Sequence, residues 1–417
     1  MQRHKLARVR WQLGQPLLPE HFTTAEDALE GEIRLMAELQ GLPCRGIATL
    51  AWNEALLSEG TLSIASLTAV LPGGYLIDVP ANAALAPFSM EATGKSQLSI
   101  YLHLLDETRS AEGVPLYADD HKAISRIIRK LILSAEPAVD GALSKIKLCE
   151  VEKSLDNSWY ISPRYVPPLL LVGGNPFLNP VLQNLAALLD RARNLLIAEI
   201  SDTYLRSDRL TNARRLFFEV RRMTAVLDDM QRQVYPHPYP FFDALRKLYF
   251  ELCCYLEMLP DEELPSYAHD DLADSFAGLL RLLGGSLKPE KQEKTHAPFV
   301  LRDGQFALSP LPSYVTEPGD LYLLIQRVEA GQPANVEGLK LASPSRLAIV
   351  RRLALRGVPW AFVPHVKFPH GFGPEIDFYQ LTTRSEEWQF AIREEGIAFF
   401  STPTLEKSQI SLYWHRS

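Results

Sequence analysis

ARVRWQLGQPLLPEHF, at residues 7–22, is the stretch around which the rest of the chain can be interpreted. It begins with apolar side chains that alternate with charged ones around Trp11, and this alternation predicts a short strand. Pro16 and Pro19 then favour an extended chain without backbone donors at those positions, which leaves little room for a helix. An apolar segment near a terminus must be held against something, because otherwise it frays. Two interpretations are open: a first strand buried in its own domain, or a surface against which a partner also packs.

Length and composition describe an ordinary soluble protein. The 417 residues are enough for about two to four domains with a large core. The net charge of −7 argues against a general nucleic-acid binder, which would show a basic domain or stripe. The four cysteines have no CxxC spacing, and this predicts a reduced, cytosolic protein. No apolar run reaches the ~18 residues that a transmembrane helix needs, and the first residues lack the apolar region of a secretory signal.

The first part of the chain reads as one helix followed by many strands. Residues 23–41 are predicted to form a helix with Thr24 as the candidate N-cap and with one mostly apolar side. Short strands separated by Gly and Pro then continue from Ile47 to Val172, and their regular spacing predicts a β-sandwich. The predicted strands are 48–52, 61–65, 66–71, 75–79, 98–104, 122–133 and 143–151.

The middle of the chain has a helical pattern. A helix is expected to begin at Asn179 and Pro180, and three more are expected over 213–234, 241–259 and 272–283. Apolar residues recur at spacings of three and four from Ala213 to Val234, which favours a coiled-coil-like seam in a bundle. A self-contained bundle and an oligomeric one are equally compatible with this pattern. The candidate oligomerisation residues are Leu216, Val220, Met223, Leu227 and Met230.

The last part reads as a separate small domain. The charged stretch 288–294 has the composition of a linker. Buried strands and two short helices follow it, which predicts a compact α/β head. The predicted fold class is therefore multidomain α+β, with an N-terminal β-sandwich, a central helical bundle and a small C-terminal α/β head. The predicted domains are 1–175, 176–285 and 297–417, with a linker at 286–296.

Three stretches resemble the TssK family, also called ImpJ or VasE, which are baseplate subunits of type VI secretion systems. The opening stretch is similar to the family pattern W-x-E-G-x-x-L-x-P-Q-H-F, although Leu13 and Glu20 stand where the family usually has Glu and Gln. A second stretch resembles the family element P-x-Y-x-P-P-L-L, and the order of elements after residue 297 resembles the family's head. The matching residues are Trp11, Gly14, Leu18, Pro19, His21, Phe22, Pro163, Tyr165, Pro167, Pro168, Leu169, Leu170, Ser343, Pro344, Gly357, Val358, Pro359, Phe378, Tyr379, Trp388, Ile397, Ala398 and Phe399.

This resemblance implies a structural adaptor. Family members are cytoplasmic homotrimers recruited to the inner face of the inner membrane. Their N-terminal shoulder docks on the TssF–TssG wedge, and their head binds the cytoplasmic parts of TssL and TssM. Nucleic acid and direct membrane insertion are not expected. The residues expected to bind the wedge are Trp11, Leu18, Pro19, His21 and Phe22.

Signs of catalytic chemistry are weak, and we expect no cofactor, no metal and no enzyme activity. Gly94, Lys95 and Ser96 resemble the end of a phosphate loop, but position 89 is Ser where that motif needs Gly, so a turn is the better interpretation. His365 and His370 lack partners at metal-ligand spacing. Two alternatives to the adaptor are a receptor-binding component of another phage-tail-like contractile particle and, with less support, an enzyme whose site assembles from distant residues.

Overall fold

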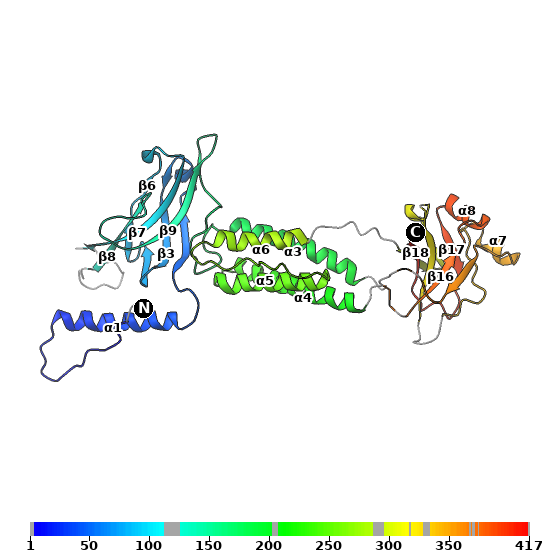
Figure 1. Cartoon of the computed structure of the whole chain (residues 1–417), viewed down its shortest axis with the longest axis horizontal. Coiled ribbons are helices and arrows are strands. Elements are labelled where there is room, and N and C mark those ends of the chain that lie inside the picture. Colours follow the sequence, from blue (N-terminus) through cyan, green and yellow to red (C-terminus); the bar gives the residue numbers. More distant parts are fainter. Residues whose placement is uncertain are drawn as a thin grey trace. The chain divides into compact units, whose positions relative to one another are not determined.

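The computed structural model describes residues 4–111, 126–201, 207–286, 296–316, 318–327, 334–366, 368, 372–373 and 375–415. The chain divides into two compact units, Met1–Arg193 with Leu216–Leu287, and Asn194–Arg215 with Lys288–Ser417 (Figure 1). Most of the predicted linker, 287–295, lies outside the described residues, as do the first four residues of the predicted strand 122–133. The predicted domain limits stay predictions.

Two larger sheets and the two-stranded antiparallel pair β2-β6 form the β part of the first unit. One has the strand order β1-β3-β4, and the other has the order β10-β9-β7-β8-β5, in which only the β5–β8 pair is parallel. Successive side chains of a strand point to opposite faces of its sheet. In β4, Ile77 and Val79 are therefore buried on one face, while Leu76 is exposed on the other. The strands are β1 Gly46–Trp52, β2 Thr61–Leu62, β3 Ile64–Leu71, β4 Tyr75–Val79, β5 Ala83–Leu85, β6 Phe88–Ser89, β7 Gln97–Ala111, β8 Arg126–Ser134, β9 Ala142–Lys153 and β10 Trp159–Ile161, with the short helix α2 at Glu54–Ser58.

The opening stretch differs from its prediction. Residues 4–18 form no strand, and the first helix, α1, spans Pro19–Glu38 rather than 23–41. Proline fits the first position of a helix because the missing N–H would have no intrahelical partner there. Thr24 lies inside the helix instead of capping it, and its hydroxyl donates to the Glu20 carbonyl at 2.7 Å. Local alternation was misleading because it extended over too few residues to define a strand.

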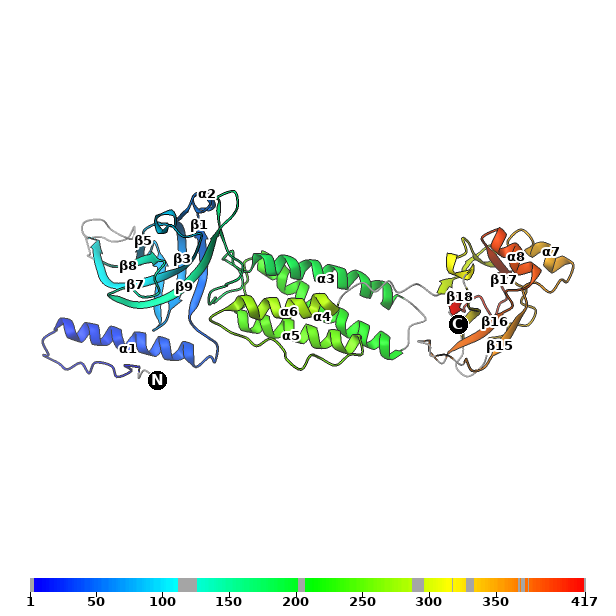
Figure 2. The ribbon, with the colours of Figure 1, turned by 45° about the horizontal axis from the view of Figure 1, so that its top comes forward.

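Four long helices follow the β part, as predicted. They are α3 Asn179–Ile200, α4 Ser207–Gln231, α5 Pro238–Tyr255 and α6 Leu272–Ser286 (Figure 2). Phe241 and Phe242 of α5 contact the ring of Phe276 on α6, with centroids 5.8 and 6.0 Å apart. A small cavity of wholly apolar lining lies between the four helices. It is bounded by Leu185, Leu188, Leu189, Ala192, Leu216, Val220, Leu248, Leu252 and Leu283.

Polar contacts join the helices to the β part of the first unit. The N–H of Val172 donates to the Pro236 carbonyl at 2.9 Å, and the N–H of Leu272 donates to the Val166 carbonyl at 3.0 Å. The guanidinium of Arg45 also pairs with Asp270 at 2.6 Å. The loops on either side of α5 are therefore bonded to the segments that flank the sheets.

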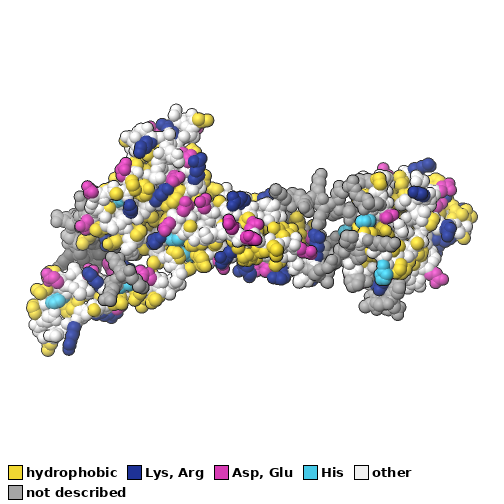
Figure 3. All heavy atoms as spheres, viewed as in Figure 1, with side chains coloured by type: hydrophobic (Ala, Val, Ile, Leu, Met, Phe, Trp, Pro, Cys, Tyr) yellow, Lys and Arg dark blue, Asp and Glu magenta, His cyan; other side chains and the backbone are white. Residues whose placement is uncertain are grey.

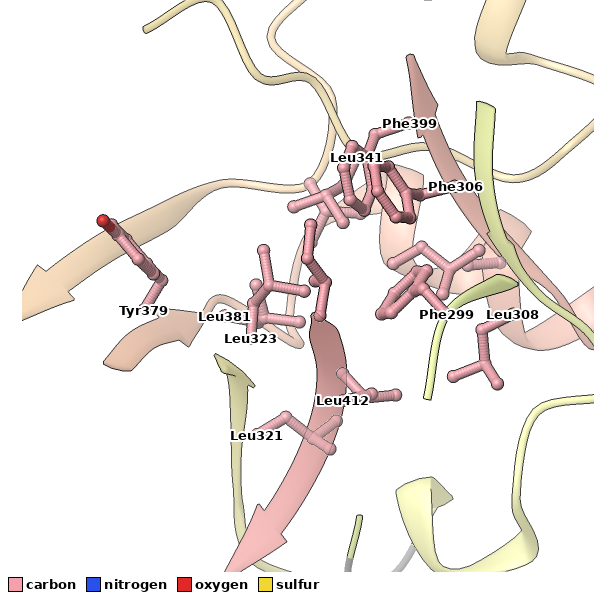
Figure 4. Close-up of a cluster of buried hydrophobic side chains, with 14 of the residues drawn as sticks. Phe299, Phe306, Leu308, Leu321, Leu323, Leu341, Tyr379, Leu381, Phe399 and Leu412 are labelled. Carbon is pink, nitrogen blue, oxygen red and sulfur yellow. The ribbon is translucent and has the colours of Figure 1, made fainter. Parts of the chain in front are cut away.

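The C-terminal part is richer in strands than the predicted α/β head. Its two sheets, in the orders β11-β18-β14-β16-β15 and β12-β13-β17, are antiparallel throughout. The rings of Phe306 and Phe399 stack with centroids 5.2 Å apart in the core that both sheets share (Figure 4). The elements are β11 His296–Pro298, β12 Val300–Arg302, β13 Gln305–Leu308, β14 Asp320–Gln326, α7 Leu347–Arg352, β15 Trp360–Val363, β16 Ile376–Leu381, α8 Glu386–Arg393, β17 Ile397–Phe400 and β18 Ile410–His415.

The general arrangement of N-terminal sheets, then helices, then a separate C-terminal domain is the predicted one. The sequence pattern missed β11, β12 and β13 because they are three or four residues long. Among the described residues, no helix is both long enough and apolar enough to cross a lipid bilayer.

Candidate partner-binding surface

Residues 4–18, which we call the N-terminal arm, lie along α1 and are held there by ion pairs. Lys5 contacts Asp27 at 2.6 Å, and Arg8 contacts Glu32 through two hydrogen bonds of 3.0 and 2.7 Å. Gly31 lets the arm approach closely, because a Cβ there would lie 2.6 Å from the Lys5 carbonyl oxygen. The arm and α1 therefore form one continuous surface.

An aromatic cluster closes the turn between the arm and α1. The ring of Trp11 lies 5.7 Å from that of His21 and 6.1 Å from that of Phe22, measured between centroids. The backbone N–H of Leu18 donates to His21 Nδ1 at 3.1 Å, which satisfies a donor at the start of the helix. The amide of Gln15 lies 2.8 Å from the other ring nitrogen of His21. These contacts hold the turn in one conformation without burying it.

The sequence-predicted wedge residues lie at this turn, and all of them except the partly buried His21 are exposed. Trp11 is 50% exposed and Phe22 is 51% exposed, while Leu18 and Pro19 are also on the surface. The interpretation of this stretch as a buried first strand is therefore wrong. Large aromatic side chains that stay half exposed in an ordered turn are typical of a contact surface.

The exposed apolar surface continues along α1. Phe22, Leu29, Ile33 and Met36 follow one another at spacings of seven, four and three residues, and this places them on one side of the helix. Ile33 and Met36 are each 68% exposed. Figure 3 shows yellow hydrophobic side chains on the visible side of this helix. The sequence marked this side as apolar, but it did not show that the side faces outward.

The opposite side of α1 is occupied by the chain itself. Ala28 and Gly31 are buried, and the guanidinium of Arg34 lies 5.4 Å from the centroid of the Tyr75 ring in β4. The hydrogen bonds from Arg8 hold the pKa of the Glu32 carboxyl below its usual value. Glu32 thus stays ionised beside the arm. Lys5 and Arg8 of the arm are paired with acids of α1, and the apolar side remains uncovered.

The candidate oligomerisation residues are in a different environment. Leu216, Val220, Met223 and Met230 are buried within the chain, and Leu227 is partly buried. Leu216 and Val220 line the apolar cavity of the bundle together with side chains of three other helices. The seam is therefore filled by the chain's own helices, and its part in oligomerisation stays a prediction.

Chemical sites are not apparent among the residues that the structure describes. No group of three or more His, Cys, Asp or Glu side chains gathers in a way that could hold a metal ion there. His365 is exposed, and His370 lies outside the described residues. Burial raises the pKa of the Cys149 thiol to about 12, which leaves it protonated and unreactive near neutral pH. The arm and α1 are thus the best candidate for a functional surface.

Comparison with known proteins relates the chain to type VI secretion. The profile of a family described as bacterial type VI secretion, with the members EvfL, ImpJ and VasE, matches residues 21–124 and 117–414. The type VI secretion system baseplate component TssK1 of Pseudomonas aeruginosa is 25% identical over 427 residues, which cover 94% of this chain and 95% of the relative.

Two solved structures have a similar fold, and one of them matches almost the whole chain. A crystal structure of TssK is 20% identical, covers 99% of this chain and 100% of its own, and gives a TM-score of 0.57. A chain in the cryo-electron microscopy structure of a type VI TssK-TssF-TssG baseplate subcomplex is 19% identical, covers 68% of this chain and 98% of its own, and gives a TM-score of 0.54. The first of these, the crystal structure of TssK, shares the order of N-terminal sheets, central helices and C-terminal β-rich domain.

Proposed function

This chain belongs to the TssK (ImpJ/VasE) family of type VI secretion baseplate components, which are structural proteins rather than enzymes, and from this premise we propose that it is an adaptor within the baseplate. Its arm and α1 bind the wedge proteins TssF and TssG. Its C-terminal domain binds the cytoplasmic parts of the membrane proteins TssL and TssM. It acts as a homotrimer in the cytoplasm, at the inner face of the inner membrane.

The observation that carries the proposal is the concentration of exposed hydrophobic side chains at the N-terminus. Soluble proteins rarely leave a contiguous apolar patch uncovered unless a partner covers it. A chain of similar fold is part of a TssK-TssF-TssG subcomplex, and this favours the wedge proteins as the partner. Ten large hydrophobic residues are exposed here: Leu6, Trp11, Leu13, Leu17, Leu18, Phe22, Leu29, Ile33, Met36 and Leu39.

The test is capture of the wedge by the full-length chain. Wild type and a Trp11→Ser/Phe22→Ser variant are each co-expressed with TssF and TssG and purified through a tag on this chain. The variant should lose the wedge proteins but keep TssL and TssM in a parallel capture, because only the arm has changed. A Leu155→Ser variant, which alters an exposed leucine between β9 and β10, is the matched control. Equal recovery of the wedge by all three proteins argues against the proposal.

The homotrimer is tested separately. Light scattering after size exclusion at micromolar concentration should give three times the mass of one chain. A mass of one chain at that concentration argues against a trimer.

A further inference from the structure

The end of α7 presents an unusual group of exposed side chains in the C-terminal domain. Residues 349–356 read IVRRLALR, and every residue from Arg351 to Arg356 is exposed. Leu353 is 58% exposed, and Ile349 and Leu355 are also on the surface. Where Figure 1 places α7, Figure 3 shows blue basic side chains beside yellow hydrophobic ones. We call residues 349–356 the α7 tip.

The α7 tip is held in a defined conformation. The N–H of Leu355 donates to the Val350 carbonyl at 2.9 Å, and the N–H of Ala354 donates to the Arg351 carbonyl at 3.2 Å. This pair of bonds is the Schellman motif that ends many helices. Ala354 adopts the left-handed conformation that the motif requires, with φ of 54°. The exposed leucines are therefore displayed by an ordered turn.

The arginines of the α7 tip are not neutralised by acidic side chains. Arg351 lies over the Phe400 ring at 4.3 Å, and no ion pair joins Arg352 or Arg356 to a described carboxylate. One nearby acid of α8, Glu387, is engaged elsewhere. Glu387 pairs with Arg346 at the start of α7 at 2.6 Å. Positive charge therefore gathers beside exposed apolar side chains.

We propose that the α7 tip binds the surface of a bilayer that carries anionic lipid headgroups. A small convex group of leucines can enter the boundary between headgroups and acyl chains, while the flanking guanidinium groups contact lipid phosphates. The complementary charge of an anionic leaflet attracts the free arginines, and no groove is needed on the partner. This inference goes beyond the proposed function, in which the C-terminal domain contacts membrane proteins. It also differs from the expectation of no direct membrane insertion, since only side chains at one tip enter the interface.

The test is sedimentation of the full-length chain with lipid vesicles. One set contains phosphatidylcholine with phosphatidylglycerol, and the other contains phosphatidylcholine alone. Wild type should bind the anionic set in a salt-sensitive way and should not bind the neutral set. Arg352→Gln/Arg356→Gln should weaken binding by about 25-fold, at about fivefold for each basic residue near the surface. Leu353→Ser/Leu355→Ser should weaken it by about tenfold.

A matched control separates local contact from general attraction by charge. Arg214→Gln/Arg221→Gln removes the same charge from exposed positions of α4 and should bind like wild type. The proposal is overturned if this control loses binding as strongly as the α7 tip variants, or if wild type does not distinguish the two vesicle sets. It is also overturned if the α7 tip variants sediment like wild type yet no longer capture TssL or TssM, since the tip would then bind protein. Loss of wedge capture by the arm variants bears only on the proposed function.

Discussion

The imidazole rings of His237 and His269 lie nearly parallel, at 12° to each other and with centroids 5.7 Å apart. His237 Nε2 lies 3.0 Å from the Pro43 carbonyl oxygen, and His269 Nε2 lies 2.7 Å from the Arg45 carbonyl oxygen. His237 Nδ1 accepts the N–H of Tyr239 at 3.1 Å, which caps α5. Two histidines beside the helices thus hold the segment that precedes β1.

The hydrogen bond that His237 Nδ1 accepts from Tyr239 requires a neutral ring. Burial is the largest cause that lowers the pKa of both histidines, although the carbonyl contact of each ring opposes it. For His269, the charge of Arg45 and the neighbouring His237 also lower the pKa, and Asp270 opposes them. Protonation would place a proton on His237 Nδ1 against the N–H of Tyr239, and it would set two like charges side by side.

The first prediction is that acid weakens the contacts of His237 and His269 and so lowers the stability of the fold. In the folded chain, the pKa values of His237 and His269 lie below the ordinary value of 6.5. Between these lowered values and pH 6.5, the unfolded chain therefore binds more protons than the folded chain. Stability should be complete above about pH 6.5 and should fall as pH falls toward the lowered pKa values. Denaturant unfolding of the whole chain across this range measures it. A His237→Asn/His269→Gln variant should show a flatter dependence, since Asn still caps a helix. His365→Gln, at an exposed position, should follow wild type.

The second prediction separates the apolar side of α1 from the aromatic cluster. Ile33→Ser/Met36→Ser should leave the unfolding free energy within about 0.5 kcal/mol per site, because both side chains are exposed. It should weaken capture of the wedge by at least about thirtyfold, the effect of one interface hot spot. Titration of tagged protein against TssF and TssG measures this. A Leu76→Ser/Leu155→Ser variant removes two exposed leucines elsewhere and should bind normally. Normal binding by the α1 variant would restrict the contact to the arm.

The third prediction concerns the bundle. Leu216→Ala should cost ~2–5 kcal/mol of unfolding free energy, because Leu216 is buried and already borders a cavity. Phe218→Ala, two residues further on the same helix, should change the folding of the chain by only about 0.5 kcal/mol, since its side chain is exposed. Urea unfolding of both variants provides the comparison. Equal losses would mean that the exposed side of α4 is also buried in solution.

The fourth prediction concerns a buried ion pair in the C-terminal domain. The Arg327 guanidinium donates two hydrogen bonds to Asp377 Oδ1, at 3.0 and 2.7 Å, and the N–H of Ala334 donates to Oδ2 at 2.9 Å. These bonds raise the pKa of Arg327. Asp377→Asn should cost about 3 kcal/mol, because a partly buried cation loses its partner. Thermal unfolding of the variant measures this loss. Asp303→Asn, at an exposed turn, should leave the unfolding free energy nearly unchanged in the same assay.

The fifth prediction tests the conformation of the α7 tip. Ala354→Gly should stabilise the chain by about 0.5–1 kcal/mol. Glycine avoids the cost of about 1–2 kcal/mol that alanine incurs in the left-handed conformation. The greater conformational entropy of glycine in the unfolded chain offsets only part of this gain. Ala361→Gly in the exposed strand β15 should instead destabilise it. Chemical denaturation distinguishes the two signs. Destabilisation by Ala354→Gly would contradict the Schellman turn.

Much of the secondary structure follows from the sequence, because periodicity depends only on local geometry. The spacing of three and four from Ala213 to Val234 predicted α4, and the strand pattern predicted β4 at its observed bounds. The prediction failed at 7–22, where too few residues alternate to distinguish a strand from an extended arm. That arm is held by Lys5 and Arg8 on α1, and pairs so distant in the sequence leave no local pattern.

The sequence by itself determined which side chains are apolar and on which side of each element they lie. Only the tertiary structure decided which of those sides the chain covers. Leu216 and Ile33 both belong to apolar helix sides with similar spacing, yet one is buried among the chain's own helices and the other is exposed. The reason is physical. The spacing of apolar residues shows which side of a helix is hydrophobic. Which segment covers that side depends on how distant parts of the chain pack together.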